Sequence, residues 1–469
     1  MKSIKPLLLA ASAIVATAPV WSAEVTINAD RVAVIDGQPT FILGLYENPE
    51  DDAVLKAAAE AGINLVHASA TKESLDRIQS AGAGAWLNTG YDIDFSADAE
   101  AKKGKLAEAV NTLGSHPALI VWEVPDEALW NAWYMAEVWR IVDEPRQLKA
   151  AAEALEDKAL AAKIVTDLEE LKRLQKHGLW AAGEALADSM WTAMGKDIPQ
   201  PGFGLSNAPE RAAKLGEGML LGYQALREID PKHPVWMNHA PRNTIEDLAF
   251  FDRAADIVGC DIYPVPEAPQ IRHSDLANRT LASVGAYTRR MQEAAPGKPT
   301  WMVLQGTGWG DFQEKFTEEE KKQMRRPRKD ETRFMAYDAI VHGARGILYW
   351  GTQFVEKDSA FWLDLLAVVK ELDGLQHVLT APDSPTKPMI GIAPTNRSLD
   401  RTVATLSKAV PGGDWHIIVN EFESPLAVTV AGLSGNYRVH GEDLPVEAGN
   451  GSLVVYMPAY SVAVLAPAV

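Results

Sequence analysis

The stretch VWEVPDEALW, residues 121–130, places Asp126 and Glu127 side by side directly after an apolar run. An apolar environment raises the pKa of a carboxyl group, and a carboxyl group that stays protonated can act as a general acid. The pair is therefore a candidate for acid–base chemistry, although for either residue alone a solvated loop position is the simpler interpretation. Aromatic rings are expected around the pair and at the same end of the fold, namely Trp122, Trp130, Trp133, Trp139, Trp309 and Trp350.

Similar residues follow other apolar runs along the chain. Carboxylates, amides and aromatic rings recur there, and core packing alone accounts for only some of the rings. Cleavage of a glycosidic bond needs one protonated acid and one ionised carboxylate, and flat aromatic rings suit the faces of sugars. The positions are Tyr46, Glu47, His67, Asn88, Asn238, His239, Asp261, Tyr263, Gln305 and Trp350.

Several other chemistries lack their motifs in this sequence. It contains no HExxH, no cysteine cluster and no Asp-x-Asp-x-Asp-Gly loop, so no metal site is predicted. It also contains no GxSxG elbow, no GxxxxGK[ST] loop and no glycine-rich turn with dinucleotide spacing. We therefore expect no cofactor, and carboxylate chemistry in an aromatic cleft remains.

A regular alternation of strands and helices is predicted to position these residues. Eight apolar strands joined through helices are typical of a closed parallel (β/α)8 barrel, which gathers the carboxyl ends of its strands around one site. A doubly wound open sheet is the structural alternative. The first strand is predicted at 40–46, and helices at 51–61, 72–81, 98–113, 208–229, 244–254, 276–294 and 330–342 each lead to a further strand.

Two further parts are predicted beside this barrel of residues 24–385. Residues 130–207 form an insertion after the fourth strand that is helical by pattern and ends in the Pro/Gly-rich KDIPQPGFG. It can be a lid or cleft wall at the site, or a helical hairpin that only thickens the barrel. Residues 386–469 read as short alternating strands, which predicts an antiparallel β-sandwich. Packing against the barrel is its default role, and sugar binding is the alternative.

The N-terminal residues and the composition restrict the expected location and partners of the protein. Residues 1–23 combine two lysines, an apolar run and small residues, as a signal peptide does, so we expect a periplasmic or secreted protein without a membrane span after cleavage. The single cysteine, Cys260, excludes an intramolecular disulfide. A net charge of −18 disfavours nucleic acid as a partner. A carbohydrate substrate is expected, and nothing predicts an oligomeric state.

The segment HPALIVWEVPDEALW resembles the fourth strand of clan-A-type (β/α)8 glycoside hydrolases, whose general acid is a Glu that follows Asn or Asp. By this resemblance Glu127 is the acid. The C-terminal sandwich is also common in that group. Further segments resemble the first, fifth, sixth and eighth strands, in the order VIDGQPTFILGLYE, DPKHPVWMNH, ADIVGCDIYPVP and RFMAYDAIVHGARGILYWG.

The seventh strand departs from the family pattern. There the family carries a nucleophilic Glu, whereas KPTWMVLQGTGWG offers Gln305, whose amide is neither a base nor a good nucleophile. One explanation is an inverting mechanism with Asp261 as the base, about 6.5–9.5 Å from the acid. A second is that Asp126 or Glu47 replaces it while Asp261 binds hydroxyl groups. A third is a barrel that binds carbohydrate without cleaving it.

The sequence thus predicts an exported glycoside hydrolase of inverting or atypical mechanism, with Glu127 as acid, Asp261 as base, and Asp126 and Glu47 in reserve. The alternative is a non-catalytic periplasmic carbohydrate-binding protein on an inactive glycosidase barrel. Substrate contacts are expected from Tyr46, Glu47, Asn88, Asn238, His239, Tyr263, Gln305, Trp309 and Trp350.

Overall fold

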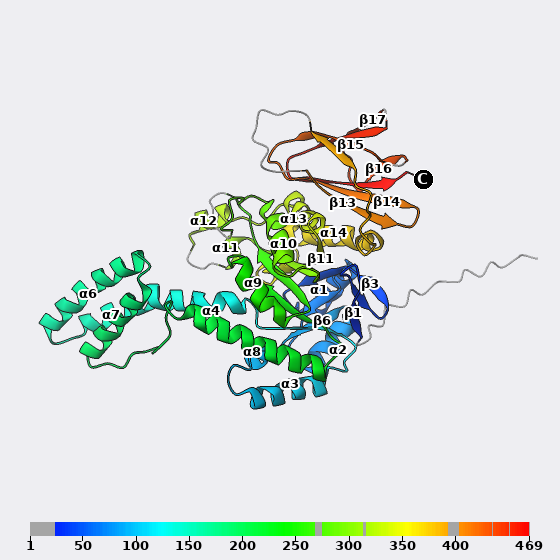
Figure 1. Cartoon of the computed structure of the whole chain (residues 1–469). Helices are drawn as coiled ribbons and strands as arrows, with labels where there is room; N and C mark the ends of the chain where they lie inside the picture. Colours follow the sequence, from blue (N-terminus) through cyan, green and yellow to red (C-terminus); the bar gives the residue numbers. More distant parts are fainter. Residues whose placement is uncertain are drawn as a thin grey trace, which may run out of the picture.

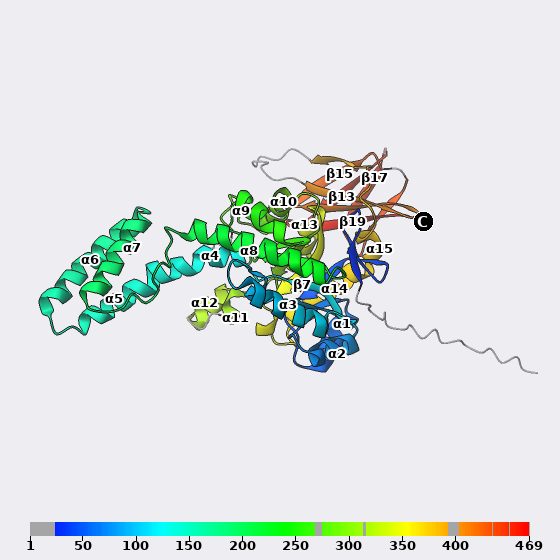
Figure 2. The same ribbon diagram turned by 60° about the horizontal axis from the view of Figure 1, so that its bottom comes forward.

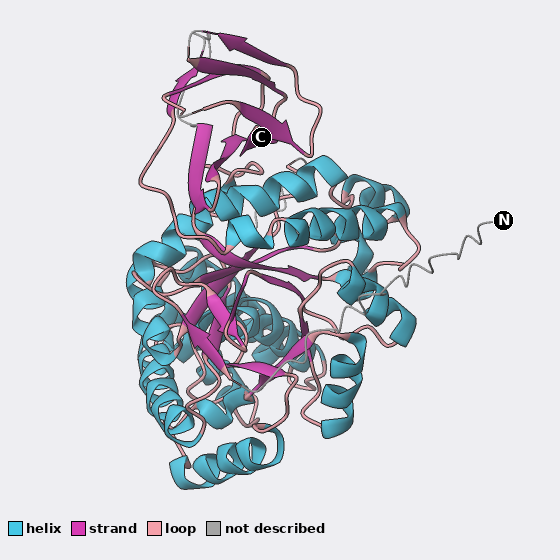
Figure 3. Cartoon of the chain, turned by 90° about the vertical axis from the view of Figure 1, so that its right-hand side faces the viewer, coloured by secondary structure: helices cyan, strands magenta, loops and turns pink. Residues whose placement is uncertain are grey.

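The computed structural model describes residues 24–267, 274–312, 316–392, 403–433, 435–449 and 451–468, so the predicted leader lies outside the described residues. Its centre is a closed barrel of eight parallel strands surrounded by helices, as the sequence predicted (Figure 3). Each strand pairs with the next along the chain, and the eighth closes onto the first. The strands are β4 (Ile42–Leu45), β5 (Leu65–His67), β6 (Gly84–Asn88), β7 (Leu119–Glu123), β8 (Val235–His239), β9 (Ile257–Ile262), β10 (Thr300–Gln305) and β11 (Ala344–Trp350).

Amphipathic helices link these strands. Asp51 caps the first of them by accepting the backbone N–H of Ala53 at 2.7 Å, and Gly82 ends the second in the left-handed conformation. The helices are α1 (Asp52–Glu60), α2 (Lys72–Ala81), α3 (Ala99–Leu113), α8 (Ala208–Ile229), α9 (Ile245–Phe251), α10 (Ser283–Ala294), α11 (Trp309–Phe312), α12 (Glu318–Gln323), α13 (Lys329–Val341), α14 (Ala360–Gly374) and α15 (Gln376–Leu379), with 3-10 turns at Gly90–Ile93, Asp252–Ala254 and Thr352–Phe354.

The helix predicted at 276–294 begins only at Ser283. The residues before it use side-chain hydrogen bonds in place of helical ones. The Oγ of Ser274 accepts the backbone N–H of Leu276, and the Oδ1 of Asn278 accepts that of Thr280. Such local bonds compete with the helix for backbone N–H groups, which explains the shorter helix.

Tryptophans fill the interior of the barrel. Trp86, Trp236 and Trp301 are fully buried there, and their rings contact one another edge-on or tilted. Glycines in the strands make room for them, because a Cβ on Gly259 would lie 1.8 Å from the carbonyl oxygen of Trp301, and one on Gly346 would lie 2.7 Å from its ring. The barrel is therefore a packed core, and any site has to lie at its mouth.

A small antiparallel sheet closes the opposite end. It contains β1 (Val25–Ile27), β2 (Ala33–Ile35) and β3 (Gln38–Thr40). The backbone N–H of Val25 donates to the carbonyl of Lys232, which precedes β8, so this sheet lies at the amino ends of the strands. Its apolar side chains belong to the same core cluster as the tryptophans of the barrel interior. Only the carboxyl ends of the strands are left for a site.

The insertion after β7 is helical. It consists of α4 (Ala128–Glu137), a π-helical segment (Val138–Asp143), α5 (Glu144–Glu153), α6 (Lys158–Lys176) and α7 (Trp180–Ala193). Figures 1 and 2 agree that α6 and α7 project away from the barrel. The helices α5 to α7 bury a small core of their own. This arrangement is an outward arm.

The C-terminal part is a β-sandwich of two antiparallel four-stranded sheets, in the orders β12-β15-β18-β17 and β13-β14-β19-β16. It packs beside α13 (Figure 1). Within the described residues no helix is long and apolar enough to cross a membrane. The strands are β12 (Met389–Ile392), β13 (Val403–Val410), β14 (Gly413–Asn420), β15 (Leu426–Ala431), β16 (Tyr437–His440), β17 (Val446–Gly449), β18 (Ser452–Met457) and β19 (Ser461–Pro467).

Candidate active site

A cavity of about 280 Å³ opens at the carboxyl ends of the barrel strands. Residues at or just after the carboxyl ends of six of the strands, β4, β7, β8, β9, β10 and β11, meet there, although they are far apart in the sequence. All of its lining residues but Phe312 are among those that the sequence singled out. The lining consists of Tyr46, Asp126, Glu127, Asn238, Asp261, Tyr263, Trp309, Phe312 and Trp350.

Glu127 occupies a constrained backbone position at the mouth of the barrel. It precedes the first residue of α4 and has φ of 51°, the left-handed region that non-glycine residues rarely adopt. Its backbone N–H donates to the carbonyl of Asn238 on β8 at 3.2 Å. Its carboxyl group forms no hydrogen bond that caps the helix, and the residue lines the cavity instead. Such strain is typical of functional positions.

The carboxyl group of Glu127 donates a hydrogen bond to Asp261 at the end of β9. Burial, and next the charge of Asp261, raise the pKa of Glu127 to about 10. Burial and the charge of Asp126 raise the pKa of Asp261 to about 7, against hydrogen bonds from Glu127 and Tyr263 that lower it. The two groups titrate as a pair that holds one proton between these values, and the proton resides on Glu127.

Asp126 lies at the rim of the cavity. Its carboxylate accepts the Nδ2–H of Asn238 at 2.9 Å, and the residue is exposed to solvent. The surrounding protein raises the pKa of Asp126 by desolvation, while the hydrogen bond from Asn238 lowers it. Because water reaches this residue, we expect the net effect to be smaller than for the buried Asp261. Asp126 therefore provides a charge and a hydrogen-bond acceptor at the entrance.

A fourth carboxyl group near the site, that of Glu123, was missed in the sequence. It is the last residue of β7, is buried, and accepts hydrogen bonds from Tyr46 Oη at 3.0 Å, Trp86 Nε1 at 3.1 Å and Asn88 Nδ2 at 2.8 Å. Burial, and next the charge of Asp126, raise the pKa of Glu123 to about 8. Tyr46 and Asn88, which were expected to bind substrate, hold this carboxyl group beneath the cavity.

The signal for Glu123 was present in the sequence. The run LIVWEV ends in an acid, and an acid in an otherwise apolar strand needs a polar partner inside the fold. Phe312 gave a weaker signal, because a Phe in the short helix α11 is as easily a packing residue. Each of the two residues lies close in the sequence to a residue that was predicted, Glu123 to Asp126 and Phe312 to Trp309.

Aromatic rings form one wall of the cavity. Tyr263 and Trp350 are stacked at 5.3 Å between ring centroids with an angle of 15°, and Trp309 contacts Tyr263 edge-on at 6.1 Å. Phe312 meets Trp350 edge-on at 5.4 Å. Trp309 and Trp350 remain partly accessible. Such rings can stack on a flat apolar ligand face while the carboxyl groups opposite them bind polar groups.

Gln305 does not line the cavity. Its buried amide accepts the backbone N–H of Val265 at 2.9 Å and donates to the carbonyls of Val265 at 2.7 Å and Thr307 at 3.0 Å. The site needs two donor hydrogens and one acceptor, which an amide provides and a carboxylate does not. Gln305 thus fixes the loop after β9 and does not line the cavity, contrary to the substrate contact that was expected from the sequence.

Glu47 and His239 also point elsewhere. Glu47, the alternative base expected from the sequence, forms an ion pair with Lys357. Its carboxylate is therefore already engaged. His239 is buried, with its Nε2 2.9 Å from Oδ1 of Asp252 on the helical side of the barrel. The structure therefore does not bring these two residues to the cavity as substrate contacts.

The tryptophans expected around Asp126 and Glu127 separate into different environments. Trp122 donates to Asp230 Oδ2 at 2.7 Å in the core outside the barrel. Trp133 lines another groove, of about 650 Å³, between the insertion and the helices α8 and α9. Of the described residues from the π-helical segment to the end of α7, none lines the active-site cavity, so the arm is not a wall of it.

The hydrogen bond between Glu127 and Asp261 also corrects the geometry expected for an inverting mechanism. That mechanism needs carboxyl groups about 6.5–9.5 Å apart with a water between them. Here the two groups are in direct contact. Asp261 therefore does not have the position of a water-activating base relative to Glu127.

No protein-family model matches the chain, and no curated protein sequence matches it. Solved structures with the same fold include glycoside hydrolases. A glycoside hydrolase family 5 protein from Bacteroides vulgatus ATCC 8482 is 14% identical with a TM-score of 0.50, and the match covers 95% of this chain and 94% of that one. For a β-galactosidase from Bacillus circulans sp. alkalophilus the identity is 12% and the TM-score 0.50, over 92% and 99%.

Some of the other β-galactosidases that the chain matches are considerably longer. One from Rahnella sp. R3 is 13% identical with a TM-score of 0.44, and 73% of this chain matches only 57% of that protein. At such identities the likeness is one of fold. The fold class is a (β/α)8 barrel with a C-terminal β-sandwich, which glycoside hydrolases use.

Proposed function

We propose that the protein is a glycoside hydrolase that cleaves O-glycosidic bonds of a poly- or oligosaccharide. Glu127 is the general acid and Asp261 the second carboxylate. The observation that supports this is the Glu127–Asp261 pair, which shares one proton opposite an aromatic wall at the carboxyl ends of the strands. Glycosidic cleavage needs one protonated and one ionised carboxyl group, and this pair provides both near neutral pH.

The contact between the two carboxyl groups favours a retaining reaction over the inverting one expected from the sequence, because retaining enzymes keep these groups only about 5–5.5 Å apart. A sugar that enters between them breaks their hydrogen bond. Glu127 then protonates the glycosidic oxygen while Asp261 attacks the anomeric carbon, which forms a glycosyl ester and releases the leaving group. Glu127, now ionised, removes a proton from water, which hydrolyses the ester and restores both groups.

The remaining lining residues suit a sugar ring. Trp309 and Trp350 are accessible for stacking, and Asp126 with Asn238 can bind hydroxyl groups at the entrance. None of the described residues that line the cavity is an arginine or a lysine, which favours a neutral glycan over a uronate or a sulfated one. The solved structure from Bacillus circulans sp. alkalophilus, which shares this fold, is a β-galactosidase, so β-galactosides are among the first substrates to test.

We also propose that the protein works outside the cytoplasm, in the periplasm or the medium. This rests on the sequence of residues 1–23 alone. Separation of a culture into cytoplasm, periplasm and medium, with an antibody against the sandwich, tests it. Detection only in the cytoplasm contradicts export.

A carbohydrate-binding protein without catalytic activity is the second candidate function. Two observations favour it: the Glu127 proton is engaged by Asp261, and the seventh strand carries Gln305 with a structural task. Such a protein would bind a glycan against Trp309 and Trp350 and leave it intact.

One experiment distinguishes the two functions. The mature chain and its Glu127→Gln variant are incubated with plant, algal and bacterial glycans and with aryl β-galactosides, and released reducing ends and glycan binding are both measured. Release by the wild type alone, with binding by both proteins, supports the hydrolase. Binding without release by either protein supports the second function. The absence of both, at saturating concentrations of every glycan, contradicts both proposals.

A further inference from the structure

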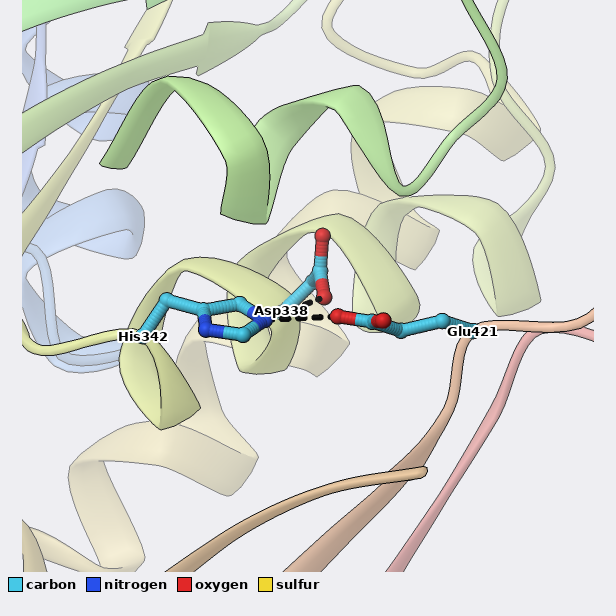
Figure 4. Close-up of side chains that lie close together, drawn as sticks. All are labelled: Asp338, His342 and Glu421. Atoms are coloured by element: carbon cyan, nitrogen blue, oxygen red, sulfur yellow. Dashed lines mark hydrogen bonds and ion pairs between the residues drawn. The ribbon is translucent and has the colours of Figure 1, made fainter. Parts of the chain in front are cut away.

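Three potential metal ligands meet at the junction between the barrel and the sandwich. Asp338 and His342 lie four residues apart at the carboxyl end of α13, so they share one face of the helix, and Glu421 follows β14 of the sandwich (Figure 4). One ligand atom from each residue lies within 4.8 Å of the others. None of the three residues lines the active-site cavity, and all three lie well after Glu127 and Asp261 in the sequence.

The carboxyl group of Asp338 points into this cluster, toward His342 and Glu421. Its Oδ2 accepts the backbone N–H of Gly285 at 2.7 Å, which fixes the orientation of the group. Its Oδ1 faces His342 Nε2 at 3.7 Å, and a hydrogen bond links the buried carboxyl groups of Asp338 and Glu421. Two buried carboxyl groups in contact repel each other unless a proton or a cation lies between them.

Gly285 leaves room around the cluster. A Cβ at this position of α10 would lie 2.2 Å from the Cδ2 of His342 and 2.9 Å from Oδ1 of Asp338. Only glycine is therefore compatible with the observed side-chain positions. The third ligand atom, Glu421 Oε1, is 2.6 Å from His342 Nε2. The three side chains thus converge on one point from two domains (Figure 4).

We propose that Asp338, His342 and Glu421 bind a zinc ion that fastens the sandwich to the barrel. One imidazole nitrogen and two carboxylate oxygens are a ligand set that Zn²⁺ accepts, with water in the fourth position. At metal–ligand distances of about 2.0–2.2 Å, tetrahedral ligands are about 3.4 Å apart. The separation between His342 and Asp338 already fits, and Glu421 has to withdraw from His342 by less than about 1 Å.

Arg289 is the charged neighbour of this site. Its Nη1 is 3.0 Å from both ring nitrogens of His342. Since the two lone pairs of the ring diverge, a nitrogen at equal distance from both lies over the face of the ring and occupies neither lone pair. Without a metal, His342 can instead donate to Glu421 in a simple hydrogen-bonded network. The two interpretations are distinguished by added zinc, which should bind to a metal site and should not bind to a simple hydrogen-bonded network.

The test uses the full chain after treatment with EDTA. Zinc chloride is titrated by calorimetry, and the unfolding temperature is measured with and without the ion. We expect one zinc ion per chain with micromolar or tighter affinity and a higher unfolding temperature. Magnesium, which prefers oxygen ligands, serves as the comparison ion and should give no shift.

Matched variants identify the ligands. His342→Ala and Glu421→Gln should each weaken zinc binding at least about 100-fold. His116→Ala is the control, because His116 is also buried against one carboxylate, with Nε2 3.0 Å from Asp76, and should leave zinc binding unchanged. Wild-type zinc binding in both ligand variants, or no zinc binding by the wild type, overturns the proposal. Should His342→Ala fail to fold, Glu421→Gln at the domain edge provides the same measurement.

Discussion

Glu127 and Asp261 are joined by a hydrogen bond across the mouth of the barrel, and the proton in it belongs to Glu127. The fourth and sixth strands thereby hold a protonated acid, Glu127, in direct contact with an ionised carboxylate, Asp261. Two ionised carboxylates at this distance would repel each other strongly, so the pair is stable with one negative charge. The resting site therefore contains a protonated acid at neutral pH.

Replacement of Glu127 by Gln should abolish hydrolysis and leave the fold intact. The Gln amide can still donate to Asp261, but it has no proton to transfer to a leaving group. We expect kcat on an unactivated glycan to fall by about 10²- to 10⁴-fold, with an unchanged circular dichroism spectrum. Glu137→Gln, in the same helix α4 but outside the cavity, is the control with normal activity. Substantial turnover by Glu127→Gln would remove the residue from the acid role.

The activity should follow a bell-shaped pH profile. Hydrolysis needs Asp261 ionised and Glu127 protonated, so the rate should rise as the pH passes about 7 and fall as it passes about 10. The charge of Asp126 raises both pKa values, so Asp126→Asn should move both limbs to lower pH. Asp197→Asn, at an exposed position of the insertion, should move neither. A profile in Asp126→Asn identical to that of the wild type contradicts this coupling.

Gln305→Glu should not supply the missing nucleophile of the seventh strand. A carboxylate there would face the carbonyls of Val265 and Thr307 and lose both donated hydrogen bonds. We expect a loss of about 2–5 kcal/mol in the free energy of unfolding, measured with urea, and no gain in kcat. Gln147→Glu, exposed on α5, is the neutral control. A stable and more active Gln305→Glu protein would mean that this side chain reaches the substrate.

The barrel and most of the cavity lining were predictable because both depend on local patterns. Apolar runs such as PTWMVLQG fix the strands, and a closed parallel barrel brings their carboxyl ends together whatever the details. Tyr263 and Trp350 could be placed at one mouth for this reason. Side-chain direction depends on neighbours that the sequence does not specify. Gln305 turns to a loop, and Glu47 turns to Lys357.

The distance between Glu127 and Asp261 was not predictable either. It depends on the tilt of β7 and β9 and on the left-handed backbone of Glu127, which sets the direction of its side chain. Glu123 was hidden by its position within a strand, because an inward or outward direction follows from register. Sequence patterns thus located the site, whereas the roles of the residues inside it depend on their three-dimensional arrangement.

Glu123 should affect stability through its protonation. Its folded pKa of about 8 exceeds the ordinary 4.5, so the stability contributed by the neutral form is complete below about pH 4.5 and is lost as the pH rises through about 8. Glu123→Gln cannot ionise, and its oxygen can still accept from Trp86 and Asn88. We therefore expect the variant to gain a few kcal/mol over the wild type in urea unfolding between about pH 5 and pH 8.

Glu123→Ala is the opposing control. It leaves the donors of Tyr46, Trp86 and Asn88 without an acceptor and should destabilise the protein by about 3 kcal/mol or more at both pH values. Equal pH dependence of stability in Glu123→Gln and the wild type would show that Glu123 does not carry the raised pKa.

The configuration of the first product should be that of the substrate. Because Asp261 touches Glu127, no water fits between them, and direct attack by Asp261 on the anomeric carbon is the reaction that this geometry favours. ¹H NMR recorded within the first minutes of cleavage, before the anomers interconvert, should therefore detect the retained anomer. Asp261→Asn should abolish its formation, whereas Asp126→Asn should only reduce it. An inverted first product would show that water attacks directly, and the base would then have to lie farther from Glu127 than Asp261 does.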